Sequence, residues 1–328
     1  MKQDVYFRVD ANSRIGLGHA MRCIALAQML QGEFNIVFFC RELPESLQII
    51  LKGSNIKLHR ISAESEFLSS VRTGSIVVLD GYDFDIIYQQ ELRSLGCKLV
   101  CIDDLHDKEF FADLIINHAP GVGPSDYKAQ PYARLALGPE YALLRPAFLL
   151  KAKKSRKIER VESVLICFGG TDNNNLTERT LSLVLASHKF KQINVITGSE
   201  FSHLDSLKIM LKENEIVTHY HMLDEQELSS LMWASDLAIV PASVILFEAL
   251  ALGCKVISGY YVDNQMEIYR GFLELNAFVD AGNFDSERVI NSLGMIDKHS
   301  TIRIFDGNSA GRVLNCFKNL SNAGSNIS

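Results

Sequence analysis

The chain has 328 residues, of which 47% are hydrophobic and 22% are charged, so it can form a large core and is long enough for two domains. A formal net charge of −6 excludes the basic field that attracts nucleic acid or anionic membranes. No apolar run approaches the ~20 residues that span a bilayer, and the N-terminal residues lack a signal-peptide core. The cysteines are scattered and odd in number, which favours reduced, buried thiols in a cytoplasmic protein and gives no metal-binding spacing.

Apolar strands and amphipathic helices alternate along the first half of the chain. The pattern predicts helices at residues 18–30, 46–52 and 85–95, and strands at residues 5–9, 35–40, 57–61, 75–79, 98–102 and 113–117. This alternation predicts a doubly wound, mainly parallel sheet, in which ligands bind beyond the carboxyl ends of the strands. Several polar residues follow strands and are expected to gather at that edge with His19, namely Asp10, Tyr82, Asp83, Asp103 and Asp104.

The same pattern restarts after a proline- and glycine-rich loop at residues 120–131 and a basic segment at residues 151–160, which we interpret as a solvated linker. The second half predicts helices from residue 176, at 225–234 and up to 252, and strands at 163–168, 193–197, 215–219, 236–240 and 255–258. The fold class is therefore α/β with two Rossmann-like, doubly wound domains. We place them at residues 1–150 and 151–328.

The first candidate site is the glycine-rich turn between the first strand and the first helix. Gly16 and Gly18 would let main-chain N–H groups approach an anion, and the helix N-terminus adds partial positive charge. His19 lies in the first helical turn, and imidazole suits general-base chemistry near pH 7. Asp10 is a candidate to orient or charge-stabilise that imidazole. The alternative is a plain tight turn with a capping histidine.

The second candidate site lies in the second half of the chain. Gly169, Gly170 and Thr171 follow a buried strand and precede a helix, which suits a diphosphate but also suits a simple turn. Ser243 could start a helix and bind phosphate, and Glu248 on that helix could accept hydrogen bonds from a ribose diol or simply face solvent. Two further candidates for sugar contacts follow a strand, Asn264 and Gln265.

With these residues in hand, the chain resembles a known family, the UDP-2,4-diacetamido-2,4,6-trideoxy-β-L-altropyranose hydrolases of pseudaminic acid biosynthesis. The resemblance covers roughly residues 5–267. It rests on segments that occur in the same order, FRVDANSRIGLGHAMRCIALA, LDGY, IDD, GPEYALLRPAF, ICFGGTDNNN, ASDLAIVPASVILFEALALG and DNQ. Where many relatives have a GGST-like turn, this chain has PASVILFE, which keeps Ser243 but not the glycines.

The resemblance implies a GT-B-like fold, with two Rossmann-like domains facing a central cleft, and a small-molecule UDP-sugar substrate. His19 matches the general base that activates water to attack the anomeric carbon, with inversion and release of UDP and the free sugar. Tyr82 matches an active-site tyrosine, and Asp10 is grouped with these two as catalytic. The implied substrate-binding residues are Gly16, Gly18, Arg22, Gly169, Gly170, Thr171, Ser243, Glu248, Asn264 and Gln265. The resemblance implies no cofactor and no metal.

Two other functions stay open on the sequence. A glycosyltransferase on the same scaffold would replace water with an acceptor hydroxyl, although the first half has no apolar basic helix of the kind that docks on lipid-linked acceptors. A non-catalytic UDP-sugar-binding protein would not need His19 in the first helical turn with Asp10 upstream of it. Release of UDP without an acceptor separates these readings.

Overall fold

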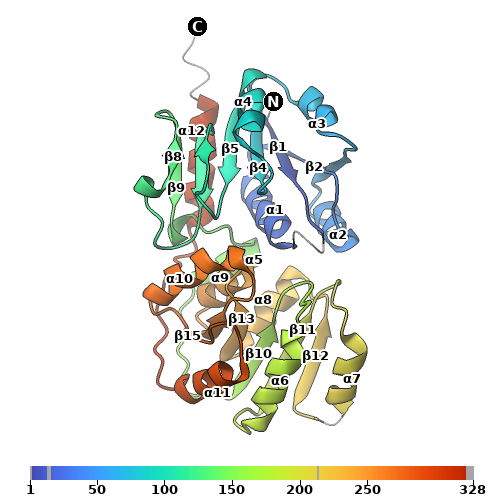
Figure 1. Ribbon diagram of the computed structural model, residues 1–328, viewed down its shortest axis with the longest axis vertical. Coiled ribbons are helices and arrows are strands. Elements are labelled where there is room, and N and C mark those ends of the chain that lie inside the picture. Colours follow the sequence, from blue (N-terminus) through green and yellow to red (C-terminus); the bar gives the residue numbers. More distant parts are fainter. Residues whose placement is uncertain (1, 13–15, 213, 323–328) are drawn as a thin grey trace. The chain divides into compact units, whose positions relative to one another are not determined.

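The computed structural model describes residues 2–12, 16–212 and 214–322 (Figure 1). The chain divides into two compact units. The first comprises Met1–Pro146 with Asn308–Ser328, and the second comprises Ala147–Gly307. Each unit is built around its own parallel sheet, which agrees with the expected α/β class.

The first unit has a sheet in the order β3-β2-β1-β4-β5-β7-β9. Its long strands are apolar and buried, so they form the middle layer between helices. The strands are β1 (Asp4–Val9), β2 (Asn35–Cys40), β3 (Lys57–Arg60), β4 (Ile76–Asp80), β5 (Lys98–Ile102), β7 (Leu114–Asn117) and β9 (Arg134–Leu137), with the pair β6 (Glu109–Phe110) and β8 (Lys128–Ala129) apart from this sheet. The helices are α1 (Gly18–Leu30), α2 (Glu45–Gly53), α3 (Glu64–Ser70), α4 (Ile86–Ser94) and α12 (Ser309–Asn322).

Helix α12 completes the first unit although it comes last in the chain (Figure 1). Val313, Phe317 and Leu320 are buried in the same apolar core as α1, and burying a side chain of that size contributes roughly 1.5–3 kcal/mol. The Ser309 hydroxyl donates to the main-chain oxygen of Ala142 at 2.7 Å. This placement differs from the expected second domain of residues 151–328, because the partners of the apolar face of α12 are far away in sequence.

The second unit has a sheet in the order β12-β11-β10-β13-β14-β15. Its strands are β10 (Ser163–Cys167), β11 (Gln192–Thr197), β12 (Val217–His221), β13 (Leu237–Pro241), β14 (Lys255–Gly259) and β15 (Val279–Asp280). Its helices are α5 (Pro146–Ala152), which begins at the last residue of the first unit, α6 (Leu176–Ala186), α7 (Leu204–Lys212), α8 (Glu225–Ala234), α9 (Val244–Ala251), α10 (Met266–Glu274) and α11 (Ser286–Met295). All seven cysteines are free thiols, and all but Cys316 are buried.

Candidate functional site

Both expected glycine turns lie where the strand order of a sheet reverses. In the first unit this point is between β1 and β4, and in the second unit it is between β10 and β13. In open parallel sheets, ligands bind in the crevice that forms at such a point, beyond the carboxyl ends of the strands. The fold therefore supports both regions as candidate sites, each within its own unit.

His19 and Asp80 form a close pair in the first unit. His19 is in the first turn of α1, and Asp80 is the last residue of β4. The imidazole Nδ1 lies 2.6 Å from Asp80 Oδ1, and both side chains are buried. Because an ionised carboxylate can only accept, Nδ1 carries the hydrogen and donates it to Asp80. The neutral imidazole then has Nε2 as its proton acceptor.

Arg22 binds two carboxylates, that of Asp80 in this pair and that of Asp104. Its Nε donates to Asp80 Oδ2 at 2.6 Å, its Nη2 donates to Asp80 Oδ1 at 2.7 Å, and its Nη1 donates to Asp104. Arg22 is 4% exposed and Asp80 is 1% exposed, so these ion pairs are shielded from solvent. Burial alone would raise the pKa of Asp80, but Arg22 and His19 more than offset it and hold that pKa well below its usual range.

The contacts of Arg22 correct its expected role as a substrate contact. Each of its three guanidinium nitrogens donates to Asp80 or Asp104. Its Nη2 also lies 3.1 Å from His19 Nδ1, which is longer than the 2.6 Å that joins Nδ1 to Asp80. Arg22 therefore fixes the carboxylate that orients His19. Arg22 lies three residues after His19 on α1, and residues at this spacing are neighbours on one face of a helix.

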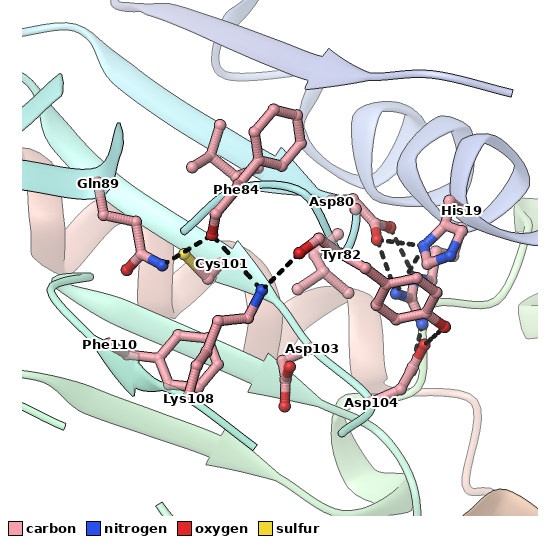
Figure 2. Close-up of a pocket in the computed structure, with 14 residues that line it drawn as sticks. His19, Asp80, Tyr82, Phe84, Gln89, Cys101, Asp103, Asp104, Lys108 and Phe110 are labelled. Atoms are coloured by element: carbon pink, nitrogen blue, oxygen red, sulfur yellow. Dashed lines mark hydrogen bonds and ion pairs between the residues drawn. The ribbon is translucent and has the colours of Figure 1, made fainter. Parts of the chain in front are cut away.

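Tyr82 lies against the imidazole of His19 (Figure 2). The two rings meet edge to face, with centroids 4.8 Å apart and planes at 84°. The Tyr82 hydroxyl donates to Asp104 Oδ2 at 3.4 Å, and the side chain is 39% exposed. His19, Tyr82, Asp103 and Asp104 line one pocket, as expected, whereas Asp83 and Asp10 do not line it.

Asp103 lines the same pocket and has a different environment. Its Oδ2 accepts hydrogen bonds from the His106 N–H at 2.8 Å and the Tyr127 hydroxyl at 2.9 Å. Burial raises its pKa, and these two donors offset part of that rise. The pocket therefore contains one carboxyl group held strongly ionised, Asp80, and a second whose pKa is raised.

Asp10 does not orient His19, which corrects the sequence-based expectation. Its Oδ2 accepts from Arg8 at 2.7 Å, and its Oδ1 accepts from the N–H groups of Arg41 and Glu42 at 2.6 and 3.1 Å. Strand β1 lies between β2 and β4, and Asp10 turns toward the chain that leaves β2. The carboxylate that reaches His19 comes from the opposite neighbour, β4.

Asp80 is therefore the functional residue that sequence reasoning missed. A signal was present, because an ionisable residue ends an otherwise apolar buried strand, IVVLD, directly before Gly81 and Tyr82. Asp80 pairs in register with Val9 of β1, which brings it to the start of the glycine turn. Identifying it needed the order of the strands, which the sequence pattern does not contain.

The glycines before His19 differ in their backbone requirements. Gly16 has a φ of +86°, and its N–H donates to the Asn12 oxygen at 2.8 Å, so a tight turn requires glycine here. A Cβ at Gly18 would meet nothing within 4 Å, so packing does not explain that glycine. The rest of the turn, residues 13–15, lies outside the described residues.

The second glycine turn is compact. Gly169 has a φ of +87°, which favours glycine. A Cβ at Gly198 would lie 2.5 Å from the Cα of Gly170, so the loop after β11 packs directly on this turn. Thr171 follows, and then Asp172 accepts from the N–H groups of Leu176 and Thr177 at 2.9 and 2.8 Å. Asp172 therefore caps the start of α6.

Ser243 and Glu248 share helix α9. Ser243 occupies the N-cap position, as expected, but its side chain makes no capping hydrogen bond. Glu248 is 1% exposed, so the alternative in which it simply faces solvent is wrong. Its carboxylate is therefore enclosed by the second unit, and its expected role in binding the ribose stays a prediction.

Asn264 and Gln265 lie in a short helical turn, Asp263–Gln265, before α10. Gln265 is 6% exposed, and its Oε1 accepts from the Tyr261 N–H at 3.0 Å, so its oxygen holds its own loop. The Asn264 Oδ1 is buried and has no hydrogen-bond partner among the described residues. Of the two amides, Asn264 has the acceptor that a ligand could engage.

Within residues 2–12, 16–212 and 214–322, no group of three or more His, Cys, Asp or Glu residues is arranged to hold a metal ion. None of the helices in those ranges is long and apolar enough to cross a membrane.

Comparison with known proteins gives relatives over most of the chain, although no protein-family model matches it. It is 29% identical over 270 residues to the UDP-2,4-diacetamido-2,4,6-trideoxy-beta-L-altropyranose hydrolase of Campylobacter jejuni, covering 80% of this chain and 93% of the relative. It is 25% identical over 291 residues to the spore coat polysaccharide biosynthesis protein SpsG of Bacillus subtilis, covering 83% and 82%. It is 28% identical over 284 residues to the uncharacterized protein MJ1062 of Methanocaldococcus jannaschii, covering 81% of this chain but only 57% of that longer protein.

Solved structures with low sequence identity share the fold. MurG of Acinetobacter baumannii aligns over 97% of this chain and 100% of its own, with a TM-score of 0.64 and 14% identity. The spinosyn rhamnosyltransferase SpnG aligns over 98% and 100%, with a TM-score of 0.62 and 14% identity. The chain is therefore a relative of the Campylobacter hydrolase and of SpsG, with the two Rossmann-like α/β units of the GT-B fold.

Proposed function

We propose that this protein is an inverting hydrolase that cleaves the anomeric C1–O bond of a UDP-linked diacetamido-trideoxyhexose. The observation that carries the proposal is the buried His19–Asp80 pair at the switch point of the first unit. Its 2.6 Å contact fixes the tautomer in which Nε2 accepts a proton. The printed name of the Campylobacter relative supplies the substrate class.

In the proposed step, His19 Nε2 removes a proton from water as the water oxygen attacks C1. The bond between C1 and the diphosphate oxygen breaks, and UDP leaves with the electron pair. Asp80 stabilises the imidazolium that forms, because its carboxylate is already bonded to Nδ1–H. Tyr82 packs edge-on against the imidazole and is partly exposed, so it could contact the substrate beside His19.

The UDP moiety belongs to the second unit in this proposal. Gly169, Gly170 and Thr171 would offer main-chain N–H groups to the diphosphate, with Ser243 at the start of α9. Glu248 would accept hydrogen bonds from the ribose hydroxyls, and Asn264 would meet the sugar.

The direct test incubates purified protein with UDP-2,4-diacetamido-2,4,6-trideoxy-β-L-altropyranose in ¹⁸O-labelled water without an acceptor. We expect UDP and free sugar, with the label on the oxygen bound to C1 of the sugar. The first spectrum of the product should show the inverted anomer. Label on UDP would mean cleavage of a P–O bond and would refute the mechanism. Release that requires an added acceptor would identify a glycosyltransferase, and binding without turnover would identify a UDP-sugar-binding protein.

His19→Gln tests the general base. We expect turnover to fall roughly 10²–10⁴-fold, which is what loss of a general base commonly costs, while UDP affinity changes little because the UDP site is in the other unit. The control is His188→Asn, since His188 is exposed and has a φ of +49°, which asparagine tolerates. Turnover of His19→Gln within a few-fold of the wild type would remove His19 from the mechanism.

A further inference from the structure

The loop at residues 103–108 holds Tyr82 at two points. Asp104 accepts from the Tyr82 hydroxyl at 3.4 Å. At the other end of this loop, the Lys108 ammonium group donates to the main-chain oxygens of Tyr82 at 3.1 Å and Phe84 at 3.4 Å. Figure 2 shows Lys108 reaching these two oxygens from the side of the pocket away from His19. One short loop therefore contacts both the hydroxyl and the main chain of Tyr82.

The main chain that Lys108 contacts has an unusual shape. Gly81 has a φ of +154°, and a Cβ there would lie 3.1 Å from the Phe84 ring, so the turn folds closely on itself. Three carbonyl contacts fix it, because the buried Gln89 also donates to the Phe84 oxygen at 3.2 Å. Gln89 is itself held by the Phe111 N–H, which donates to its Oε1 at 2.9 Å.

The ring of Tyr82 depends on this turn for its position. It lies edge-on to His19 at 4.8 Å while the residue is 39% exposed, so packing covers only part of it. Its hydroxyl contact at 3.4 Å is long for an O–H donor. The charged donor of Lys108 restrains the main chain from which this ring extends.

We propose that Lys108 is a positioning residue for the active site, which acts by holding Tyr82 over His19. The proposal rests on the proposed function for its kinetic consequence but not for its structural one. A lysine suits this task because its ammonium group offers three donors on a flexible stem, so it reaches two oxygens at once. Loss of the ammonium group removes two of the three carbonyl contacts that hold the turn at residues 81–84, which lets the ring move away from His19.

The structural test observes the His19 Cε1–H resonance by NMR of protein labelled with ¹³C-histidine, assigned with His19→Gln. Because an aromatic ring beside the imidazole shifts this resonance, Lys108→Met should move it toward its position in Tyr82→Leu. Lys108→Arg, which keeps the donors, should restore it. Lys128→Met is the matched control, since Lys128 is an exposed lysine on β8, the strand paired with β6 next to Lys108. An unchanged resonance in Lys108→Met would overturn the proposal.

The kinetic test uses a double-mutant cycle. Lys108→Met should lower kcat roughly 10–100-fold, the cost of displacing a group in an active site by about 1 Å, with KM changed less than about threefold. In the Tyr82→Leu background the same substitution should change kcat little, because the group that it positions is gone. Equal losses in both backgrounds would show a general structural effect and overturn the proposal. Lys108→Gln is too short to reach both oxygens and replaces Lys108→Met if that variant does not fold.

The two proposals fail in different ways. If the wild-type protein released no UDP from the UDP-sugar, the proposed function would fail, but the His19 resonance would still report whether Lys108 holds Tyr82. If UDP were released and the resonance of Lys108→Met matched the wild type, only the role of Lys108 would fail.

Discussion

Replacing Asp80 with asparagine tests the His19–Asp80 pair most directly. The side chain keeps its size but loses its charge and one acceptor. In the wild type, Oδ1 accepts from His19 and Arg22, and Oδ2 accepts from Arg22 Nε and from the Cys23 thiol at 3.4 Å. An amide placed here must turn its NH₂ group toward one of these sets of donors.

Both orientations of the new amide are unfavourable. If NH₂ faces Arg22 Nε, two donors oppose each other in a buried site. If it faces His19, the imidazole Nδ1 must become an acceptor, so the hydrogen moves to Nε2 and the proposed base is lost. We expect kcat to fall roughly 10³–10⁴-fold, as for loss of the orienting carboxylate in the Ser-His-Asp hydrolases. Removing one partner from a buried ion pair costs about 3–5 kcal/mol, and asparagine retains one acceptor, so we expect a loss near the lower value.

The assay combines steady-state UDP release with urea unfolding, and Asp113→Asn is the matched control. Asp113 is also buried and accepts from Arg93 and from the Leu99 N–H, but it lies before β7, at the amino edge of the same sheet. Its substitution should lower stability comparably while leaving kcat within about threefold. A folded Asp80→Asn protein with kcat close to the wild type would refute the claim that Asp80 sets the His19 tautomer.

Three further predictions address other parts of the chain. Asp10→Asn should cost about 1–3 kcal/mol of unfolding free energy, because it weakens the partly buried contact with Arg8, and should leave kcat within a few-fold. A loss of kcat as large as that of His19→Gln would return Asp10 to the catalytic group. Ser243→Ala and Glu248→Ala should weaken UDP binding measured by calorimetry, and the loss for Glu248→Ala should be roughly 10–100-fold if Glu248 accepts the ribose hydroxyls. The control Glu287→Ala, on the exposed start of α11, should leave UDP affinity unchanged. Unchanged affinity in both Ser243→Ala and Glu248→Ala would move the UDP site away from α9. His118 is buried, which lowers its pKa to about 4, so the fold favours the neutral form: its contribution to stability is complete above the unfolded pKa of about 6.5 and declines as the pH falls toward 4. His118→Asn keeps an acceptor for the Leu143 N–H but cannot titrate. Between pH 7 and pH 5 this variant should therefore lose about 2 kcal/mol less unfolding free energy, measured in urea, than the wild type. Equal losses would contradict the lowered pKa of His118.

The sheets were predictable from the sequence because their signal is local. The strand expected at residues 98–102 and the helix expected at residues 18–30 have the observed bounds. Most other expected strands differ from the observed ones by one or two residues, because apolar runs ended by glycine or polar residues mark strand ends well. Short amphipathic helices such as α3 and α7 were not predicted, since their apolar faces are small.

The side-chain pairings were not predictable, because they depend on which strands are neighbours. Asp10 is closer to His19 in sequence than Asp80 is, yet β1 has β2 on one side and β4 on the other. Asp10 contacts the chain that leaves β2, whereas Asp80 at the end of β4 contacts His19. Arg22 was likewise expected among the substrate-binding residues, whereas its guanidinium donates to two carboxylates, one at the end of β4 and one after β5. Residue type and spacing identified a candidate site, but the strand order decided the contacts within it.

The two glycine turns differ in the carboxylates beside them, which suits them to different proposed roles. In the second unit, Asp172 accepts from two N–H groups at the start of α6, which a diphosphate would otherwise use. Helix α9 differs, because its N-cap Ser243 makes no capping hydrogen bond and its first turn has no acidic residue. An anion in this unit is therefore better accommodated by the turn amides of Gly169 and Gly170 together with α9 than by α6. In the first unit, α1 also has no acidic residue in its first turn. Its first turn instead holds His19, whose imidazole contacts Asp80, and this makes the turn suited to proton transfer.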